Sequence, residues 1–105
     1  MVYVLLGTGF EEVEALAPVD LLRRAGVQVQ TVGITGKMVY GSHRIGVEAD
    51  ILPEEMDLGA MEMIVLPGGL GGGASARASQ AALDALRPTG PFPSLGRSAE
   101  PGTVF

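Results

Sequence analysis

Three acidic residues, Glu11, Glu12 and Glu14, follow a glycine turn near the start of the chain. Carboxylates at the start of a helix can act as general acids or bases, or can complement the helix dipole by about 0.3–1 kcal/mol each. Glu14 stands at helical spacing from Phe10 and Pro18, which places it nearer the apolar side of the expected helix. A carboxylate there is costly unless it has a function, and the residues alone leave a functional and a structural interpretation open.

The same turn does not favour a nucleotide. In the dinucleotide-binding fingerprint a third glycine is required where this chain has Glu12. Three carboxylates in one helical turn would also repel a pyrophosphate. The sequence therefore predicts no nucleotide cofactor here.

A second candidate for chemistry is the glycine-rich segment 67–73, Pro-Gly-Gly-Leu-Gly-Gly-Gly, which directly follows an apolar run. Glycines allow backbone N–H groups to approach a ligand, as in anion-binding holes. The segment is not a phosphate-binding loop, because no Gly-Lys-Ser/Thr follows it. Open α/β sheets bind ligands at the carboxyl ends of their strands, so the position supports a binding site. A flexible connection between a strand and a helix is the alternative interpretation.

The remaining reactive side chains are few. His43 is the only histidine, and the chain has no cysteine, which excludes a Cys–His pair, a disulfide and thiolate metal ligands within these residues. No serine lies in a Gly-x-Ser-x-Gly elbow. No metal-ligand spacing appears either, so the sequence predicts no metal site.

The elements that must position these residues follow from hydrophobic periodicity. Strands are expected at residues 2–6, 27–32 and 63–66, short hairpin strands at 38–40 and 45–51, and helices at 11–26 and around 79–87. Pro18 is expected to kink or divide the first helix, and Gly26 to cap it. The apolar residues of this helix that recur at roughly helical spacing are Val13, Leu16, Val19, Leu21 and Leu22.

The order of these elements predicts the architecture. Strands alternating with helices indicate an α/β class with a mostly parallel sheet, formed by residues 1–87. Residues 88–105 contain four of the chain's seven prolines and read as an irregular or disordered tail. An outer strand of so small a sheet exposes its backbone groups unless a partner covers them.

Composition narrows the function classes. The formal net charge is -5, and no block of Lys or Arg exists to follow a phosphate backbone, so nucleic-acid binding is not expected. No apolar run reaches membrane-spanning length, and the first residues lack the features of a signal peptide. A cytoplasmic location is therefore expected.

Several separated motifs together resemble the ThiJ/PfpI family, in the branch with the parkinsonism-associated deglycase and bacterial YajL-type proteins, within the class I glutamine amidotransferase-like superfamily. The resemblance covers residues 2 to about 87, the N-terminal portion of such a domain. It rests on residues 7–15 (GTGFEEVEA), 18–26 (PVDLLRRAG), 36–37 (GK), 41–43 (GSH), 49–50 (AD) and 65–72 (VLPGGLGG).

The resemblance implies a flavodoxin-like (Rossmann-like) three-layer sandwich, incomplete at its C-terminus here, and usually a homodimer. Glu14 matches the acid that supports a reactive cysteine, and Gly68 and Gly69 match backbone groups of the anion pocket. Arg24 and His43 match positions near that pocket and the dimer contact. The resemblance implies small dicarbonyl or glycated substrates, glyoxalase, deglycase or redox-linked chaperone activity, and no cofactor; an older name links the family to thiazole monophosphate biosynthesis.

The functional prediction depends on one difference between this chain and the family. Family members continue after the second helix with a strand and a cysteine elbow, whereas this chain continues with Pro-Thr-Gly-Pro-Phe-Pro from residue 88. The sequence therefore predicts a truncated and inactive relative, from a frameshift or from a gene whose boundaries were assigned too short. The alternative is a non-enzymatic binding or chaperone-like module that pairs through an exposed sheet edge.

Overall fold

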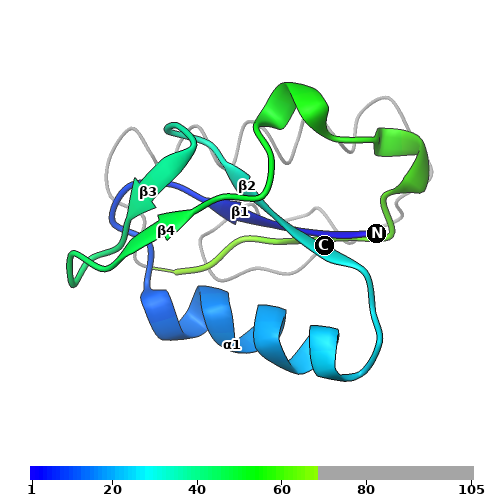
Figure 1. Cartoon of the computed structure of the whole chain (residues 1–105), viewed down its shortest axis with the longest axis horizontal. Helices are drawn as coiled ribbons and strands as arrows, with labels where there is room; N and C mark the ends of the chain where they lie inside the picture. Colours follow the sequence, from blue (N-terminus) through cyan, green and yellow to red (C-terminus); the bar gives the residue numbers. More distant parts are fainter. Residues whose placement is uncertain (69–105) are drawn as a thin grey trace.

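The computed structural model describes residues 1–68 (Figure 1). Two short 3-10 turns, Pro53–Glu55 and Leu58–Ala60, precede the last strand. The strands are β1 (Val2–Leu6), β2 (Val29–Gly33), β3 (Met38–Tyr40), β4 (Gly46–Glu48) and β5 (Met63–Val65), and the helix is α1 (Glu12–Arg24).

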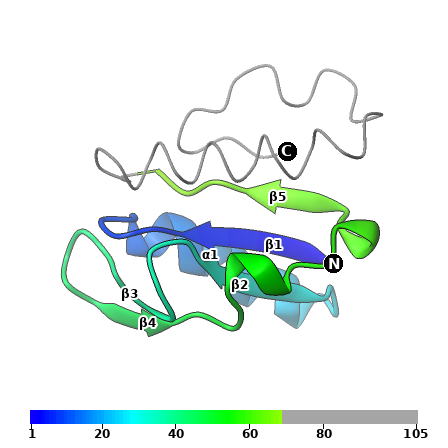
Figure 2. The same ribbon diagram turned by 90° about the horizontal axis from the view of Figure 1, so that it is seen from above.

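The main sheet is parallel and has the strand order β2-β1-β5 (Figure 2). Val4 of β1 lies opposite Thr31 of β2 and Val65 of β5. The predicted α/β class with a parallel sheet is thus confirmed. β2 lies on one side of β1 and β5 on the other. The order in which the chain adds strands to the sheet therefore reverses at β1.

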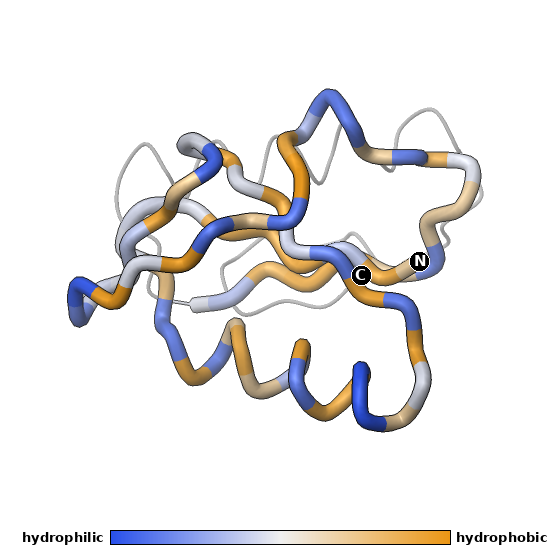
Figure 3. The backbone as a smooth tube through the Cα atoms, in the orientation of Figure 1, coloured by the Kyte–Doolittle hydropathy of each residue, from blue (hydrophilic) through white to orange (hydrophobic). Residues whose placement is uncertain are grey.

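β1 is buried along its whole length, as its continuous apolar sequence predicts. α1 covers one face of the sheet and buries Ala15 and Val19 toward it (Figure 1). Apolar colour runs along the central strands in Figure 3 and alternates with polar colour along α1. Within the described part of the chain, no helix is long and apolar enough to cross a membrane.

α1 continues through Pro18 as a single helix, so the predicted division is wrong. Pro18 cannot donate a hydrogen bond to the carbonyl of Glu14, but buried Ala15 and Val19 on either side of it hold both halves on the sheet. The predicted cap at Gly26 is confirmed, since this residue has φ 81°.

The end of α1 forms a Schellman motif, the usual C-terminal arrangement with a glycine in the left-handed region. The Gly26 N–H donates to the Arg23 carbonyl at 3.1 Å, and the Val27 N–H donates to the Leu22 carbonyl at 2.9 Å. These two bonds turn the chain toward β2, which begins two residues later than predicted.

The predicted hairpin is β3 paired antiparallel with β4, and it lies beside the N-terminal end of α1 (Figure 1). After the hairpin, the chain returns along the outer edge of β2. The Ile51 N–H donates to the Thr31 carbonyl at 3.1 Å, and the Gly33 N–H donates to the Ile51 carbonyl at 2.9 Å. The outer edge of β2 is therefore occupied by the chain itself at residues 31–33.

Asp50 fixes this return segment. Its carboxylate accepts hydrogen bonds from the Thr31 N–H at 2.9 Å and from Arg23 at 2.7 Å. Burial alone would raise the pKa of Asp50, but the bonds from Thr31 and Arg23 outweigh it and lower that pKa. The helix predicted around residues 79–87 and the tail from 88 lie outside the described residues.

Candidate functional site

The reversal at β1 creates the position where open α/β sheets bind ligands. The carboxyl end of β1 leads into Gly7 and the turn before α1, and the neighbouring carboxyl end of β5 leads into Gly68. A hydrogen bond joins these two segments, from the Glu11 N–H to the Gly68 carbonyl at 2.9 Å. The site is therefore built on the backbone of two adjacent strands.

Glu14 reaches this junction from the first turn of α1. A Cβ atom added to Gly68 would lie 3.0 Å from each carboxylate oxygen of Glu14. The carboxylate therefore rests against the Cα of Gly68, where only glycine leaves ordinary contact distance. The structure thus brings together two of the residues singled out from the sequence; Gly69 lies outside the described residues.

The burial of the acids differs from the expectation. Glu14 is exposed rather than on the apolar side of α1, whereas Glu12 is only 5% exposed. Glu12 shares the sheet-facing side with Ala15 and Val19, three and seven residues further along the helix. The sequence predicted no separate role for Glu12, although that spacing could have revealed its burial.

The buried Glu12 carboxylate anchors the β3–β4 hairpin to α1. Its Oε2 accepts hydrogen bonds from the His43 N–H at 2.8 Å and from the Ile45 N–H at 3.4 Å. Its Oε1 lies 2.9 Å from Nδ1 of the His43 ring. Burial raises the pKa of Glu12, but the bonds from the His43 ring and the backbone N–H groups outweigh this effect and lower the pKa to about 2.

Ser42 and His43 complete a polar cluster around that carboxylate. Ser42 Oγ donates to Glu11 Oε1 at 3.1 Å and lies 3.1 Å from His43 Nδ1. The hydrogen bond to Glu12, with the charges of Glu12 and Glu11, raises the pKa of His43. Serine and carboxylate both contact Nδ1, whereas a hydrolytic triad uses opposite ring nitrogens, so this cluster is not a triad.

Arg24 does not join the other predicted site residues. It lies in the last turn of α1 and forms an ion pair with Asp20 at 3.0 Å. His43 contacts the first turn of the same helix, and 13 residues span about 18–20 Å. Arg24 and His43 therefore lie at opposite ends of α1 in this chain.

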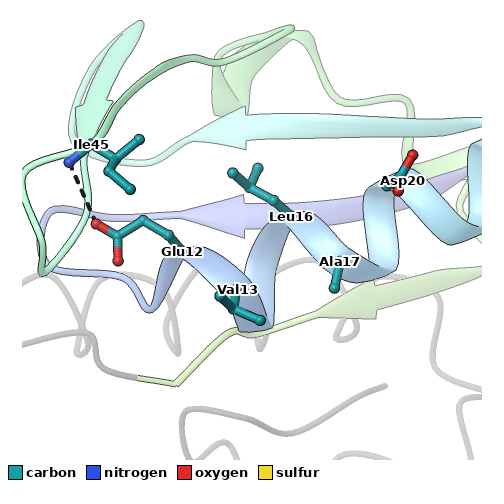
Figure 4. Close-up of a pocket in the computed structure, with 6 residues that line it drawn as sticks. All are labelled: Glu12, Val13, Leu16, Ala17, Asp20 and Ile45. Carbon is teal, nitrogen blue, oxygen red and sulfur yellow. Dashed lines mark hydrogen bonds between the residues drawn. The ribbon is translucent and has the colours of Figure 1, made fainter.

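A shallow apolar groove of about 410 Å³ runs along the outer side of α1 (Figure 4). Val13 is 78% exposed and Ile45 of the hairpin is 51% exposed, although the sequence placed Val13 in the same apolar series as the buried Val19. α1 therefore has apolar residues on two sides, one facing the sheet and one facing outward. The groove is lined by Glu12, Val13, Leu16, Ala17, Asp20 and Ile45.

Comparison with known proteins places this geometry in a family context. A family model described as the DJ-1/PfpI family matches residues 1–90. Protein DJ-1 homolog B of Arabidopsis thaliana is 33% identical over 87 residues, which cover 82% of this chain and 20% of that protein. Parkinson disease protein 7 homolog of Danio rerio is 36% identical over 86 residues, covering 80% of this chain and 46% of that protein.

A protein named Deglycase TK1284, from Thermococcus kodakarensis, is 29% identical over 68 residues, covering 65% of this chain and 41% of its own length. Among solved structures, Drosophila melanogaster DJ-1beta superposes with a TM-score of 0.72 at 32% identity, covering 84% of this chain and 48% of that one. The chain thus spans less than half the length of each of these relatives.

Proposed function

Because the chain belongs to the DJ-1/PfpI family, with a flavodoxin-like fold, we propose that its residues form the N-terminal half of a thiol-dependent site for small dicarbonyl or glycated compounds. We further propose that these 105 residues have no such turnover alone, since they contain no cysteine. A thiol nucleophile would have to come from a segment outside them. The cytoplasmic location stays a prediction.

The observation that carries the proposal is the contact between Glu14 and Gly68 at the carboxyl ends of β1 and β5. An acid at this position can hydrogen-bond a thiol or thiolate and set its ionisation. A backbone N–H at Gly68, which matches the anion pocket in the family resemblance, would stabilise a developing oxyanion. The name of the Thermococcus relative supports deglycation as one reaction of such a site.

The proposal predicts no turnover of methylglyoxal by the purified 105-residue chain. A hybrid that joins residues 1–68 to the remaining part of Drosophila DJ-1beta, at the aligned position, should be active because it supplies the family's cysteine elbow. Loss of methylglyoxal is followed in a coupled colorimetric assay. An inactive hybrid that is folded by circular dichroism, or turnover by the cysteine-free chain, would contradict the proposal.

The outward groove on α1 favours a second property, self-association as a homodimer. Val13 and Ile45 form an apolar surface, and a two-fold axis would place α1 of each protomer against the groove of the other. Burial of exposed apolar side chains stabilises such a contact by about 25 cal/mol per Å² before association costs. The β2 edge is occupied, so this face is the better candidate for the predicted dimer.

Replacing Val13 by aspartate is expected to shift the chain toward monomer, because the new charge would be buried in the contact. Sedimentation velocity at several protein concentrations measures the change. Gln28→Asp, which adds the same charge at an exposed position beyond α1, should leave the association unchanged. Equal sedimentation of wild type and Val13→Asp at all concentrations would contradict an interface at this groove.

A further inference from the structure

The cluster at the N-terminal end of α1 combines donors that are separated in the sequence. Glu11, Glu12 and His43 each present one ligand atom, and these atoms all lie within 4.8 Å of one another. Two carboxylates and one imidazole are a donor set for borderline first-row divalent cations such as zinc. The sequence showed no metal-ligand spacing because the imidazole comes from the hairpin, more than thirty residues after the acids.

The central ligand is held in place independently of any ion. Glu12 uses Oε2 for the hairpin backbone, while the partners of Oε1 among residues 1–68 are the Ser42 hydroxyl at 3.3 Å and the His43 ring at 2.9 Å. Oε1 can therefore exchange its hydrogen bonds for a bond to a cation, while Oε2 still holds the hairpin. The buried carboxylate is thereby preorganised as a ligand, which lowers the cost of assembling a site.

The remaining donors are accessible and close to coordination spacing. Zinc ligands at about 2.1 Å from the ion stand roughly 3.4 Å apart in a tetrahedron. The donor pairs around Ser42 and His43 lie at 2.9–3.3 Å. His43 is 72% exposed, so its ring can adjust by a small rotation and an ion can enter from solvent.

We propose that Glu11, Glu12 and His43 form a binding site for a divalent transition-metal ion, with zinc as the probe and the Ser42 hydroxyl as a neighbouring fourth donor. The site would tie the start of α1 to the β3–β4 hairpin through a single ion. One of its ligands, Glu11, also donates the backbone hydrogen bond to Gly68 that joins the segments after β1 and β5. It requires neither a cysteine nor turnover, so it stands apart from the proposed function.

Zinc titration of the full 105-residue chain by calorimetry should give saturable binding of one ion per chain, with no competition from excess Mg²⁺, which prefers all-oxygen octahedral sites. His43→Ala and Glu11→Gln should each weaken binding by about tenfold or more. Both variants retain Glu12 and the backbone bonds of the hairpin. Glu54→Gln, which removes an exposed carboxylate from a 3-10 turn, should bind zinc as the wild type does.

Because the chain has a single histidine, one set of imidazole resonances reports on the site directly. Zinc should shift these resonances in wild type at one equivalent. Absence of saturable binding, equal affinity in His43→Ala and wild type, or zinc binding that leaves the imidazole resonances unchanged would each overturn the proposal.

Discussion

Replacing Glu14 by glutamine in the active hybrid is expected to lower kcat/KM for methylglyoxal by about 10²–10⁴-fold, the range for loss of a positioned general acid or base. A Cβ atom added to Gly68 would lie 3.0 Å from each carboxylate oxygen of Glu14, at the point where the segments after β1 and β5 meet. Glutamine keeps the shape and hydrogen-bonding capacity but can neither hold nor release a proton at that position. The steady-state rate of methylglyoxal loss measures the effect.

The control for Glu14 must remove an exposed carboxylate away from the junction. Glu48→Gln on β4 does so with the same change in charge, and it should leave kcat/KM within about twofold of the parent hybrid. The pH dependence of the reactive thiol gives a second readout, because loss of Glu14 should change the thiol pKa along with the rate. A rate unchanged in Glu14→Gln would show that this acid only complements the dipole of α1.

The parts of the fold that could be predicted were those set by local residue types. The continuous apolar run of β1 indicated a strand buried on both faces, and Gly26 indicated a helix end, since both depend on local residue types. Pro18 showed the limit of such reasoning, because packing of the residues beside it outweighed the local cost of a missing N–H. Whether a proline interrupts a helix depends on tertiary contacts, which the local sequence does not show.

The candidate site was predictable only in part, because some of its contacts depend on tertiary structure. Glu14 and Gly68 were singled out from the sequence, their roles came from the resemblance, and the structure places them in contact. The burial of Glu12 and its bonds to His43 depend on how the hairpin folds back over α1. The outward position of Val13 was missed because α1 has apolar residues on two sides, and periodicity alone does not say which side faces the sheet.

Gly41→Ala is expected to destabilise the chain by about 1–3 kcal/mol, because the glycine leaves space that the Glu12 side chain occupies. An added Cβ would lie 2.7 Å from Glu12 Cγ and closer still to its carboxylate. Gly41 is buried and its φ lies outside the left-handed region, so the cost arises from overlap and not from backbone strain. Urea unfolding followed by circular dichroism measures the free energy of unfolding.

A double-mutant comparison separates this overlap from any general sensitivity of the hairpin. In a Glu12→Ala background the obstructing side chain is gone, so Gly41→Ala should cost much less than in wild type, a non-additivity typical of residues in contact. In a Glu12→Gln background the bulk remains while the charge is lost, so the full cost should persist. An equal cost of Gly41→Ala in all three backgrounds would mean that the hairpin does not close on Glu12. If instead the cost vanishes only with Glu12→Ala, the buried carboxylate and the glycine opposite it form one structural unit, which positions Ser42 and His43 beside α1.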